Sequence, residues 1–306
     1  MGYEEIVEKI NRLREEKEAI ILAHNYQRPE VQDIADYVGD SIELARRAMD
    51  EREAKILVVA AVDFMAENAY LLNPTKKVLI PSLNARCPMA RMLSIDDMRR
   101  YRRKYRGVPI VLYVNTFAEA KARCDVCCTS ANAVNIVEKI DSDAVIFGPD
   151  CNLAEYVQEK TEKKVIPIPE DGFCPTHLAF DEENIRLLRG KYPDAQVLVH
   201  PECTSEVRHA ADFVGSTSQI IRYARESKTK TFIVGTEEGI LHRLRKENSG
   251  KEFILAHVAG ICPNMKRNTL EGIFLSLRDE VYPVTVPKQV ASKARLALGK
   301  MFELTS

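Results

Sequence analysis

The sequence lacks a long hydrophobic segment, and this absence excludes a membrane-spanning helix from the expected fold. The longest strongly apolar run is ILVVAAV at 56–62, whereas a membrane-spanning helix needs about 20 apolar residues. The first ten residues, MGYEEIVEKI, are amphipathic and charged, which is not typical of a secretory signal. Ile6 stands where a myristoylation motif requires Ser or Thr. We therefore expect a cytoplasmic protein with no membrane partner.

An excess of charge of one sign is also missing. The 44 Lys and Arg residues nearly balance the 45 Asp and Glu residues, and the two signs are interspersed along the chain. A basic face for nucleic acid is therefore not predicted, and we expect no nucleic-acid partner. Tryptophan is absent, but 45% of the 306 residues are hydrophobic, which is enough for a substantial core.

The chain contains an internal repeat. Three short, β-branched apolar runs, each preceded by a charged helical stretch, have the sequences AIILAHN, PIVLYVN and AQVLVHPE. An aspartate follows 12 residues after the equivalent strand-end positions His24, Tyr113 and His200. Each aspartate, at positions 36, 125 and 212, opens a similar phrase: DYVGDS, DVCCTS or DFVGST. Two further strand patterns, separated by a helical pattern, complete each copy.

Three copies of a β-α-β-α-β unit predict an α/β fold of three homologous three-layer αβα domains around a pseudo-threefold axis. Alternating strands and helices of this length form parallel sheets with helices on both faces. We expect repeats at 1–86, 87–173 and 174–262, followed by a helical tail at 263–306 that packs back on them. Ligands of such sheets bind beyond the carboxyl ends of the strands, so the three rims are expected to face one central cavity.

The dipeptide Cys-Pro closes each copy, at Cys87, Cys174 and Cys262, with spacings of 87 and 88 residues. A pseudo-threefold axis would bring these three thiols together. A structural zinc site usually needs four protein ligands, and the repeat provides no fourth Cys or His. Three thiolates with one open position are better suited to an iron–sulfur cluster. The alternative is a turn inherited with the repeat, since Pro favours chain reversal.

The remaining cysteines of the eight in the chain do not follow the repeat. Cys124, Cys127 and Cys128 form the motif CDVCC, which resembles a metal or redox motif. In the other copies, Val-Gly pairs stand at the positions of Cys127 and Cys128, which favours small buried residues. Cys151 and Cys203 have no equivalents and are interpreted as structural.

Hydroxyl residues and polar strand ends predict the substrate site. Ser41, Ser130 and Thr217 stand at the expected starts of helices, beside Asp40, Thr129 and Ser216, where free N–H groups attract anions. Ordinary helix capping is the alternative reading, and it is compatible with binding. The strand ends differ between copies, as an asymmetric site requires, and carry groups able to transfer protons or orient a ligand: His24, Tyr26, Tyr113, Asn115, His200 and Glu202. His177 is a candidate to support the cysteine site.

Together these motifs resemble the quinolinate synthase family in its short, three-cysteine form. The resemblance covers almost the whole chain and includes ILAHNYQ, DIADYVGDS, VDFMAE, VLYVN, TSANAV, VIFGPD, HPEC, VGST and the three Cys-Pro pairs. It implies an enzyme that condenses iminoaspartate with dihydroxyacetone phosphate to form quinolinate, phosphate and water in NAD biosynthesis. A functional link to an enzyme that produces iminoaspartate follows from the same resemblance. Phe173, where many relatives have His, is a minor departure.

The resemblance also implies roles for individual residues. It implies one [4Fe-4S] cluster per subunit, held by Cys87, Cys174 and Cys262, whose open iron acts as a Lewis acid. It implies proton transfer by Tyr26 and Glu202 with His24 beside them. The implied substrate-binding residues are His24, Ser41, Tyr113, Asn115, Ser130, His200, Glu202 and Thr217. Two other functions remain open here: an aconitase-type hydro-lyase, which would not release phosphate, and a cluster-based sensor.

Overall fold

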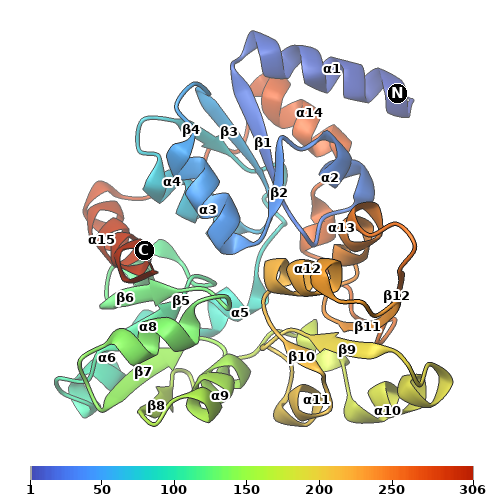
Figure 1. Cartoon of the computed structure of the whole chain (residues 1–306). Helices are drawn as coiled ribbons and strands as arrows, with labels where there is room; N and C mark the ends of the chain where they lie inside the picture. The colour runs from blue at the N-terminus through green and yellow to red at the C-terminus, as the bar shows by residue number, and fades with distance from the viewer. Residues whose placement is uncertain (1, 306) are drawn as a thin grey trace.

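The computed structural model describes residues 2–305 and contains three four-stranded sheets around a common centre (Figure 1). The expected α/β fold of three αβα units is confirmed. The first repeat consists of α1 (Tyr3–Glu16), β1 (Ala19–His24), α2 (Pro29–Ile34), β2 (Tyr37–Gly39), α3 (Ser41–Asp50), β3 (Ile56–Ala60), α4 (Asp63–Leu72) and β4 (Lys77–Leu79).

The second and third repeats follow the same order of strands and helices. The second consists of α5 (Pro88–Met92), α6 (Ile95–Lys104), β5 (Ile110–Tyr113), α7 (Ala118–Lys121), β6 (Val126–Cys128), α8 (Ala133–Lys139), β7 (Ala144–Gly148), α9 (Cys151–Lys160) and β8 (Lys164–Pro167). The third consists of η1 (His177–Ala179), α10 (Glu182–Lys191), β9 (Gln196–Val199), α11 (Ser205–His209), β10 (Phe213–Val214), α12 (Thr217–Glu226), β11 (Thr231–Gly235), α13 (Ile240–Glu247) and β12 (Glu252–Leu255). The chain then forms η2 (Met265–Arg267), α14 (Leu270–Asp279) and α15 (Lys288–Thr305).

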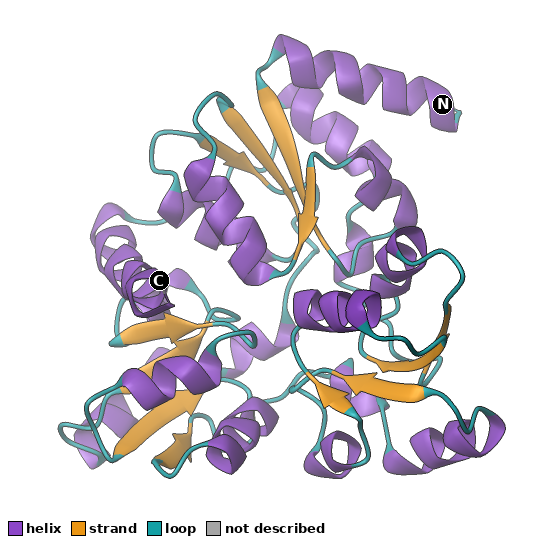
Figure 2. Ribbon diagram, viewed as in Figure 1, coloured by secondary structure: helices purple, strands orange, loops and turns teal. Residues whose placement is uncertain are grey.

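The three sheets have the same topology, with strand orders β2-β1-β3-β4, β6-β5-β7-β8 and β10-β9-β11-β12. All of these strand pairs are parallel, and helices cover both faces of each sheet (Figure 2). In each sheet the second strand of the repeat lies on one side of the first strand, and the third strand lies on its other side. The strand order therefore reverses at β1, β5 and β9. This switch point is where open parallel sheets bind ligands.

The repeated aspartates have one structural role in all three copies. Each carboxylate accepts the backbone N–H of a residue in the first strand, at 2.7 Å in every case, and pairs with an arginine of the preceding helix. The triads are Asp36 with Ile21 and Arg14, Asp125 with Ile110 and Arg102, and Asp212 with Val197 and Arg189. This triplicate contact fixes where the second strand joins the first, and it confirms that the sequence repeat is a structural repeat.

The two C-terminal helices pack on different repeats. Leu270, Ile273 and Leu277 of α14 join Ile6 and Ile10 of α1 in the core on one face of the first sheet. In contrast, α15 lies beside the second sheet (Figure 1). Its Ala294, Leu298 and Met301 belong to the core shared by the first and second repeats. The boundaries proposed at 86/87, 173/174 and 262/263 stay a prediction.

Three buried polar side chains join the repeats in a cyclic way. Gln32, Lys121 and Arg208 each donate to a backbone carbonyl in the turn after the first strand of their own repeat, namely Gln27, Thr116 and Cys203. Gln32 also donates to Gly239 O of the third repeat at 2.8 Å. Arg208 donates to Asn152 O of the second repeat at 3.1 Å, and Lys121 lies 5.8 Å from the Phe64 ring of the first repeat. Each turn is therefore held against the next repeat.

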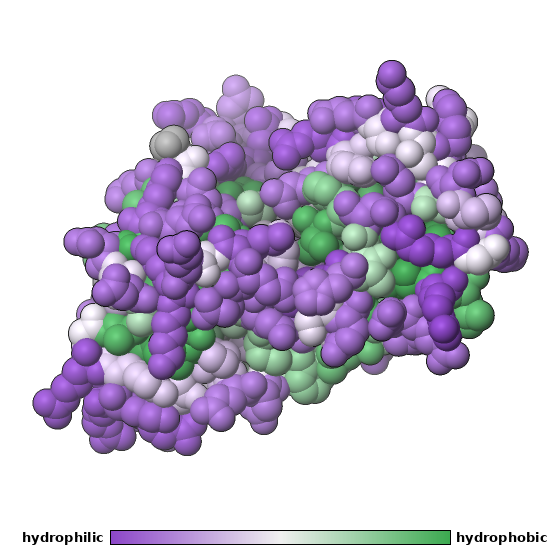
Figure 3. Space-filling model, turned by 60° about the horizontal axis from the view of Figure 1, so that its bottom comes forward, coloured by the Kyte–Doolittle hydropathy of each residue, from purple (hydrophilic) through white to green (hydrophobic). Residues whose placement is uncertain are grey.

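The molecular surface is mainly hydrophilic on the face shown in Figure 3, with hydrophobic residues in limited groups. Among residues 2–305, no helix combines the length and apolar composition needed to cross a membrane.

Candidate functional site

The carboxyl ends of the three sheets enclose one cavity of about 160 Å³. All residues predicted for the site line this cavity, although they come from three separate repeats. They are His24, Tyr26, Ser41, Cys87, Tyr113, Asn115, Ser130, Cys174, His200, Glu202, Thr217 and Cys262. The cavity is therefore the only one of the described pockets to which every repeat contributes its strand ends and its Cys-Pro turn.

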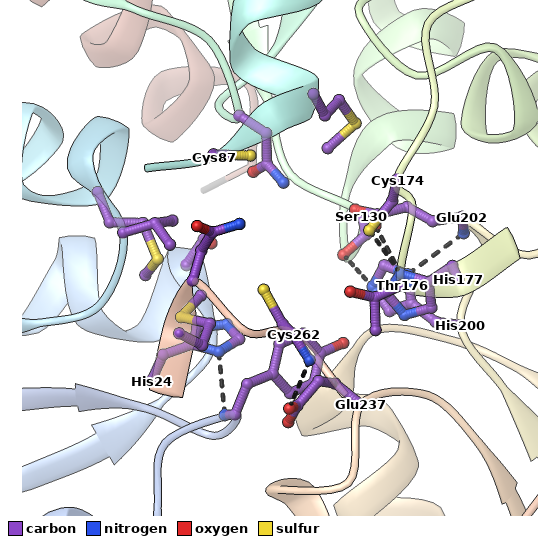
Figure 4. A pocket seen from close by; sticks show the side chains of 18 of the residues that line it. His24, Cys87, Ser130, Cys174, Thr176, His177, His200, Glu202, Glu237 and Cys262 are labelled. Atoms are coloured by element: carbon purple, nitrogen blue, oxygen red, sulfur yellow. Dashed lines mark hydrogen bonds and ion pairs between the residues drawn. The ribbon is translucent and has the colours of Figure 1, made fainter. Parts of the chain in front are cut away.

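The three Cys-Pro cysteines surround the same open space (Figure 4). Burial raises the pKa of each thiol. The backbone N–H of the residue three positions after each cysteine interacts with the sulfur and lowers this pKa. These N–H groups belong to Ala90, His177 and Met265, in the short helices that follow Cys-Pro. Such helix starts favour thiolates, which are the form that binds metal.

These residues fit a metal centre with an exchangeable ligand. The three thiols are partly accessible and face the cavity, whereas Cys127, Cys128 and Cys203 are fully buried elsewhere. Asn115 Oδ1 also lines the site and is buried with no hydrogen-bond partner among residues 2–305. A buried amide oxygen without a partner is costly, so this atom is suited to a bound ligand.

A second set of metal-ligating atoms overlaps this centre. Cys174 Sγ, a ring nitrogen of His177 and a carboxylate oxygen of Glu202 all lie within 4.8 Å of one another. His177 Nδ1 is 3.2 Å from Cys174 Sγ and 2.8 Å from Glu202 Oε2. A single ion on these three groups is the structural alternative to a cluster on the three cysteines. It would leave Cys87 and Cys262 unused.

His24 and His200 are held as neutral hydrogen-bond donors. The backbone N–H two residues later donates to Nδ1 of each ring, from Tyr26 at 3.1 Å and from Glu202 at 3.2 Å. Since Nδ1 accepts, the proton of the neutral ring is on Nε2. Burial lowers the pKa of both rings to about 3. His200 Nε2 lies 3.2 Å from Ser130 Oγ of the second repeat.

A continuous chain of hydrogen bonds joins the two predicted proton-transfer residues. Tyr26 OH lies 2.6 Å from Thr236 Oγ1, which lies 2.9 Å from His177 Nε2. His177 Nδ1 contacts Glu202 Oε2, and Tyr113 OH donates to Glu202 Oε1 at 2.6 Å. The chain crosses all three repeats, so it forms only when the repeats are assembled.

The groups in this chain have divergent acidities. Burial alone would raise the pKa of Glu202, but His177 and the Tyr113 hydroxyl hold it well below its usual range. We attribute the lowering chiefly to the two donated hydrogen bonds, because His200 is itself neutral. Burial and the Glu202 charge raise the pKa of Tyr26 and of Tyr113 well above the usual value. Glu202 is therefore an ionised acceptor, and both tyrosines keep their protons.

The three hydroxyl residues line the cavity as predicted. The prediction that they start helices is confirmed for Ser41 and Thr217 and is wrong for Ser130. Ser41 and Thr217 are the first residues of α3 and α12, while the caps are Asp40 and Ser216. Ser130 precedes α8, which begins only at Ala133. The reason is Asn132, whose Oδ1 accepts Thr129 N–H at 2.7 Å and holds an extra turn before the helix.

Sequence reasoning missed several residues around the site. Thr236 completes the hydrogen-bond chain, and Glu237 accepts the N–H of Cys262 at 3.0 Å. Gly239 packs so closely on the Tyr26 turn that a Cβ there would lie 2.6 Å from Tyr26 C. All three stand in the stretch GTEEG after β11. Its position at a strand end was the available signal, since the equivalent stretches after β3 and β7 also contain an acidic residue.

Comparison with known proteins gives the family. The family model described as quinolinate synthetase A protein matches residues 8–303. This chain belongs to the quinolinate synthase family. The quinolinate synthase of Thermotoga maritima is 52% identical over 299 residues, which are 98% of this chain and 99% of the relative. The quinolinate synthase of Methanothermobacter thermautotrophicus is 50% identical over 296 residues, 97% of each chain. That of Pyrococcus horikoshii is 50% identical over 301 residues, 98% of this chain and 99% of the relative.

The match confirms the resemblance found in the sequence. The chain is an enzyme with quinolinate synthase function in NAD biosynthesis. The sensor function is thereby ruled out as the main role, and the three-cysteine cavity is a possible metal site of this enzyme.

Proposed function

We propose that this chain condenses iminoaspartate with dihydroxyacetone phosphate to form quinolinate, one phosphate and two waters. The observation that carries the proposal is the single cavity in which three equivalent cysteines face an ionised glutamate and neutral histidine donors. The cysteines supply metal ligands, and the other groups supply binding and proton transfer. No other cavity described in residues 2–305 combines these groups.

Cys87, Cys174 and Cys262 would hold one [4Fe-4S] cluster per subunit. Three thiolates leave one iron of such a cluster without a protein ligand. When bound, the cluster would supply a Lewis acid that polarises a substrate oxygen and assists its loss as water. The partnerless Oδ1 of Asn115 supports a ligand at this place.

The chain's own residues would bind and orient the anionic substrates. The Nε2–H groups of His24 and His200 and the hydroxyl groups of Ser41, Ser130 and Thr217 line the cavity. The start of α12, whose cap is a neutral serine, adds partial positive charge, whereas the Asp40 carboxylate already accepts the N–H groups of Ile42 and Glu43 at the start of α3. Together these donors suit two carboxylates and a phosphate, without a buried lysine or arginine among the lining residues.

Glu202 and Tyr26 would transfer the protons. Glu202 is ionised and can accept a proton from substrate carbon or oxygen, whereas Tyr26 keeps its proton and can donate it to a departing oxygen. The chain through Thr236 and His177 gives a path by which the proton taken up at Glu202 returns to Tyr26. One cycle then leaves both groups as they began.

The enclosed cavity also suits an unstable substrate. Iminoaspartate hydrolyses in water, and a site closed between three repeats limits that side reaction. Its supply must come from an enzyme that oxidises an amino acid to the imine. We therefore propose a functional link to such an iminoaspartate-producing enzyme.

The first experiment counts metal. The chain is purified without oxygen, and iron and acid-labile sulfide are measured per chain before and after addition of quinolinate. Four irons and four sulfides, with a spectrum that shifts on quinolinate, are expected. Cys87→Ser, Cys174→Ser and Cys262→Ser are expected to lose iron, whereas Cys151→Ser is the matched control and keeps it. One bound zinc, with iron absent after reconstitution, would contradict the proposal in favour of the Cys174, His177 and Glu202 set.

The second experiment tests the reaction. Phosphate release is measured with iminoaspartate generated in place and dihydroxyacetone phosphate, because an aconitase-type hydro-lyase would release none. Glu202→Gln keeps the size of the side chain but removes its basicity, so a loss of about 100-fold or more in turnover is expected. Glu206→Gln, at an exposed position of α11, is the control. Full turnover by Glu202→Gln would refute the assigned role.

A further inference from the structure

Each repeat carries an acidic residue between its third strand (β3, β7 or β11) and the following helix, directly behind the Cys-Pro turn. Asp63 begins α4, Asp150 caps α9, and Glu237 precedes α13. None of them belongs to the set of groups that face substrate in the proposed function. Asp150 is fully buried, and Glu237 has no exposed surface.

Two of these carboxylates accept the backbone N–H of a cysteine, and the third acts electrostatically on the backbone of the remaining one. Asp63 Oδ1 accepts the N–H of Cys87 at 3.0 Å. Glu237 Oε1 accepts the N–H of Cys262 at 3.0 Å (Figure 4). In the second repeat, the backbone of Cys174 lowers the pKa of Asp150, against the effect of burial, but Asp150 Oδ2 is buried with no hydrogen-bond partner among residues 2–305.

Each carboxylate is also anchored to its own repeat. A backbone N–H at the start of the following helix donates to it: Phe64 N to Asp63 at 3.0 Å, Leu153 N to Asp150 at 2.7 Å and Gly239 N to Glu237 at 2.7 Å. The acid thus links the end of the third strand of its repeat to the turn after the fourth strand. A backbone N–H at or next to the acid also donates to the carbonyl two residues before the cysteine: Asp63 N to Ala85 O at 2.8 Å, Cys151 N to Gly172 O at 2.7 Å and Glu238 N to Gly260 O at 2.9 Å. The carboxylate therefore adds a second contact to this turn, at the backbone of the cysteine itself.

A cation four residues after the cysteine completes the contact in two repeats. Arg91 lies 3.1 Å from Asp63, and Lys266 lies 2.9 Å from Glu237. The equivalent residue in the second repeat is Leu178. In the first and third repeats the carboxylate therefore joins both ends of the first turn after the cysteine, which a simple helix cap would not do.

We propose that Asp63, Asp150 and Glu237 are positioning residues that hold the three cysteine turns so that their thiols point to one place before metal enters. The inference rests on the proposed function, in which these cysteines are the metal ligands. Removing such a supporting hydrogen bond typically lowers metal affinity about 10- to 100-fold. The alternative is that the acids only cap helices, in which case they would affect stability but not the retention of metal.

The test uses the full chain with its metal reconstituted anaerobically from ferrous iron and sulfide. Iron per chain and the rate of iron loss to a ferrous chelator are measured for Asp63→Ala, Asp63→Asn, Glu237→Ala and Glu237→Gln. The thermal midpoint of each metal-free variant is measured in parallel. The alanine variants are expected to lose iron about 10-fold faster or more. Asp63→Asn keeps the one oxygen that accepts both backbone N–H groups, so it is expected to retain most of the wild-type behaviour. Glu237→Gln keeps only one of the two accepting oxygens, so its rate of iron loss is expected to lie between those of the wild type and Glu237→Ala.

Asp33→Ala is the matched control, because Asp33 pairs with His242 and Lys246 across the first and third repeats without touching a cysteine. Iron loss from the alanine variants at the wild-type rate would overturn the inference. The inference would also be overturned if the rate of iron loss rose with the drop in thermal midpoint in the same proportion in Asp33→Ala and in Asp63→Ala. A wild-type chain that takes up no iron would instead refute the proposed cluster, and the positioning role would fall with it.

Discussion

Arg208 is expected to be the most sensitive of the residues that join the repeats. Its side chain is only 1% exposed and donates to Cys203 O at 2.7 Å and Asn152 O at 3.1 Å. It also pairs with Glu155 and Glu159, which are 51% and 28% exposed. Because these glutamates remain partly hydrated, the pairs themselves are worth little. The larger cost of Arg208→Met comes from two carbonyls that lose this donor, the buried Cys203 O and the partly buried Asn152 O.

We expect Arg208→Met to lower the free energy of unfolding by about 3 kcal/mol, at ~1–2 kcal/mol for each carbonyl. For a chain of this size that is roughly a 5 °C lower thermal midpoint. Cys203 follows Glu202 directly, so KM for the substrates is also expected to rise as the turn loosens.

Calorimetry of the metal-free chain measures the first effect, and initial rates of the reconstituted enzyme measure the second. Arg208→Lys is the matched variant, because Lys121 occupies this position in the second repeat; about half of the loss is expected. Glu155→Gln is expected to cost less than ~0.5 kcal/mol. If Arg208→Met stayed within ~1 kcal/mol of wild type, or Glu155→Gln cost as much as Arg208→Met, the argument from these two carbonyls would be refuted.

Three further outcomes are expected. Burial lowers the pKa of His24 and His200 to about 3, so the unfolded chain binds more protons below pH 6.5 and stability falls as pH decreases. Each ring should lower the free energy of unfolding by about 1.4 kcal/mol at pH 5.5. When denaturation is measured at several pH values, His200→Gln should abolish the loss due to one ring, and the exposed His209→Gln should leave both losses in place. Gly239→Ala should push the Tyr26 turn away and reduce kcat. Gly190→Ala, in an open position of α10, should raise the free energy of unfolding by ~0.5–1 kcal/mol and leave kcat unchanged. Equal activity of the two variants would contradict the close packing at Gly239. Cys124 Sγ and Cys127 Sγ lie 3.9 Å apart outside the cavity, so Cys124→Ser should keep full iron content, and loss of iron would show a second site.

The repeat made much of the fold accessible from the sequence. Equal spacings place equivalent residues at equivalent strand ends, so the convergence of Cys87, Cys174 and Cys262 on one cavity could be predicted without a structure. The α/β class followed from alternating apolar patterns. The start of α8 could not be predicted, because it depends on one side-chain contact of Asn132.

Contacts between repeats were beyond the reach of sequence patterns. Thr236 resembles any small residue at the end of a strand, and only the apposition of the first and third repeats brings it to Tyr26. Arg208 and Lys121 resemble surface residues of short helices, yet both are buried. The roles of Asp63 and Glu237 likewise depend on a turn that is distant in sequence. Comparing the three copies position by position would have revealed these acids as a set.

The order of the elements along the chain has a consequence for synthesis on the ribosome. Cys262 is the last of the three cysteines, and α14 then returns to cover the sheet of the first repeat while α15 returns to the second. Neither of the first two repeats can bury its core fully while the C-terminal segment is still in the exit tunnel. A nascent chain that is truncated before α14 therefore lacks the two helices that cover the first and second sheets, and it exposes apolar sheet surface. If it ends before Cys262, it also lacks one of the three cysteines. Incomplete products would accordingly be open to proteases before they could acquire metal.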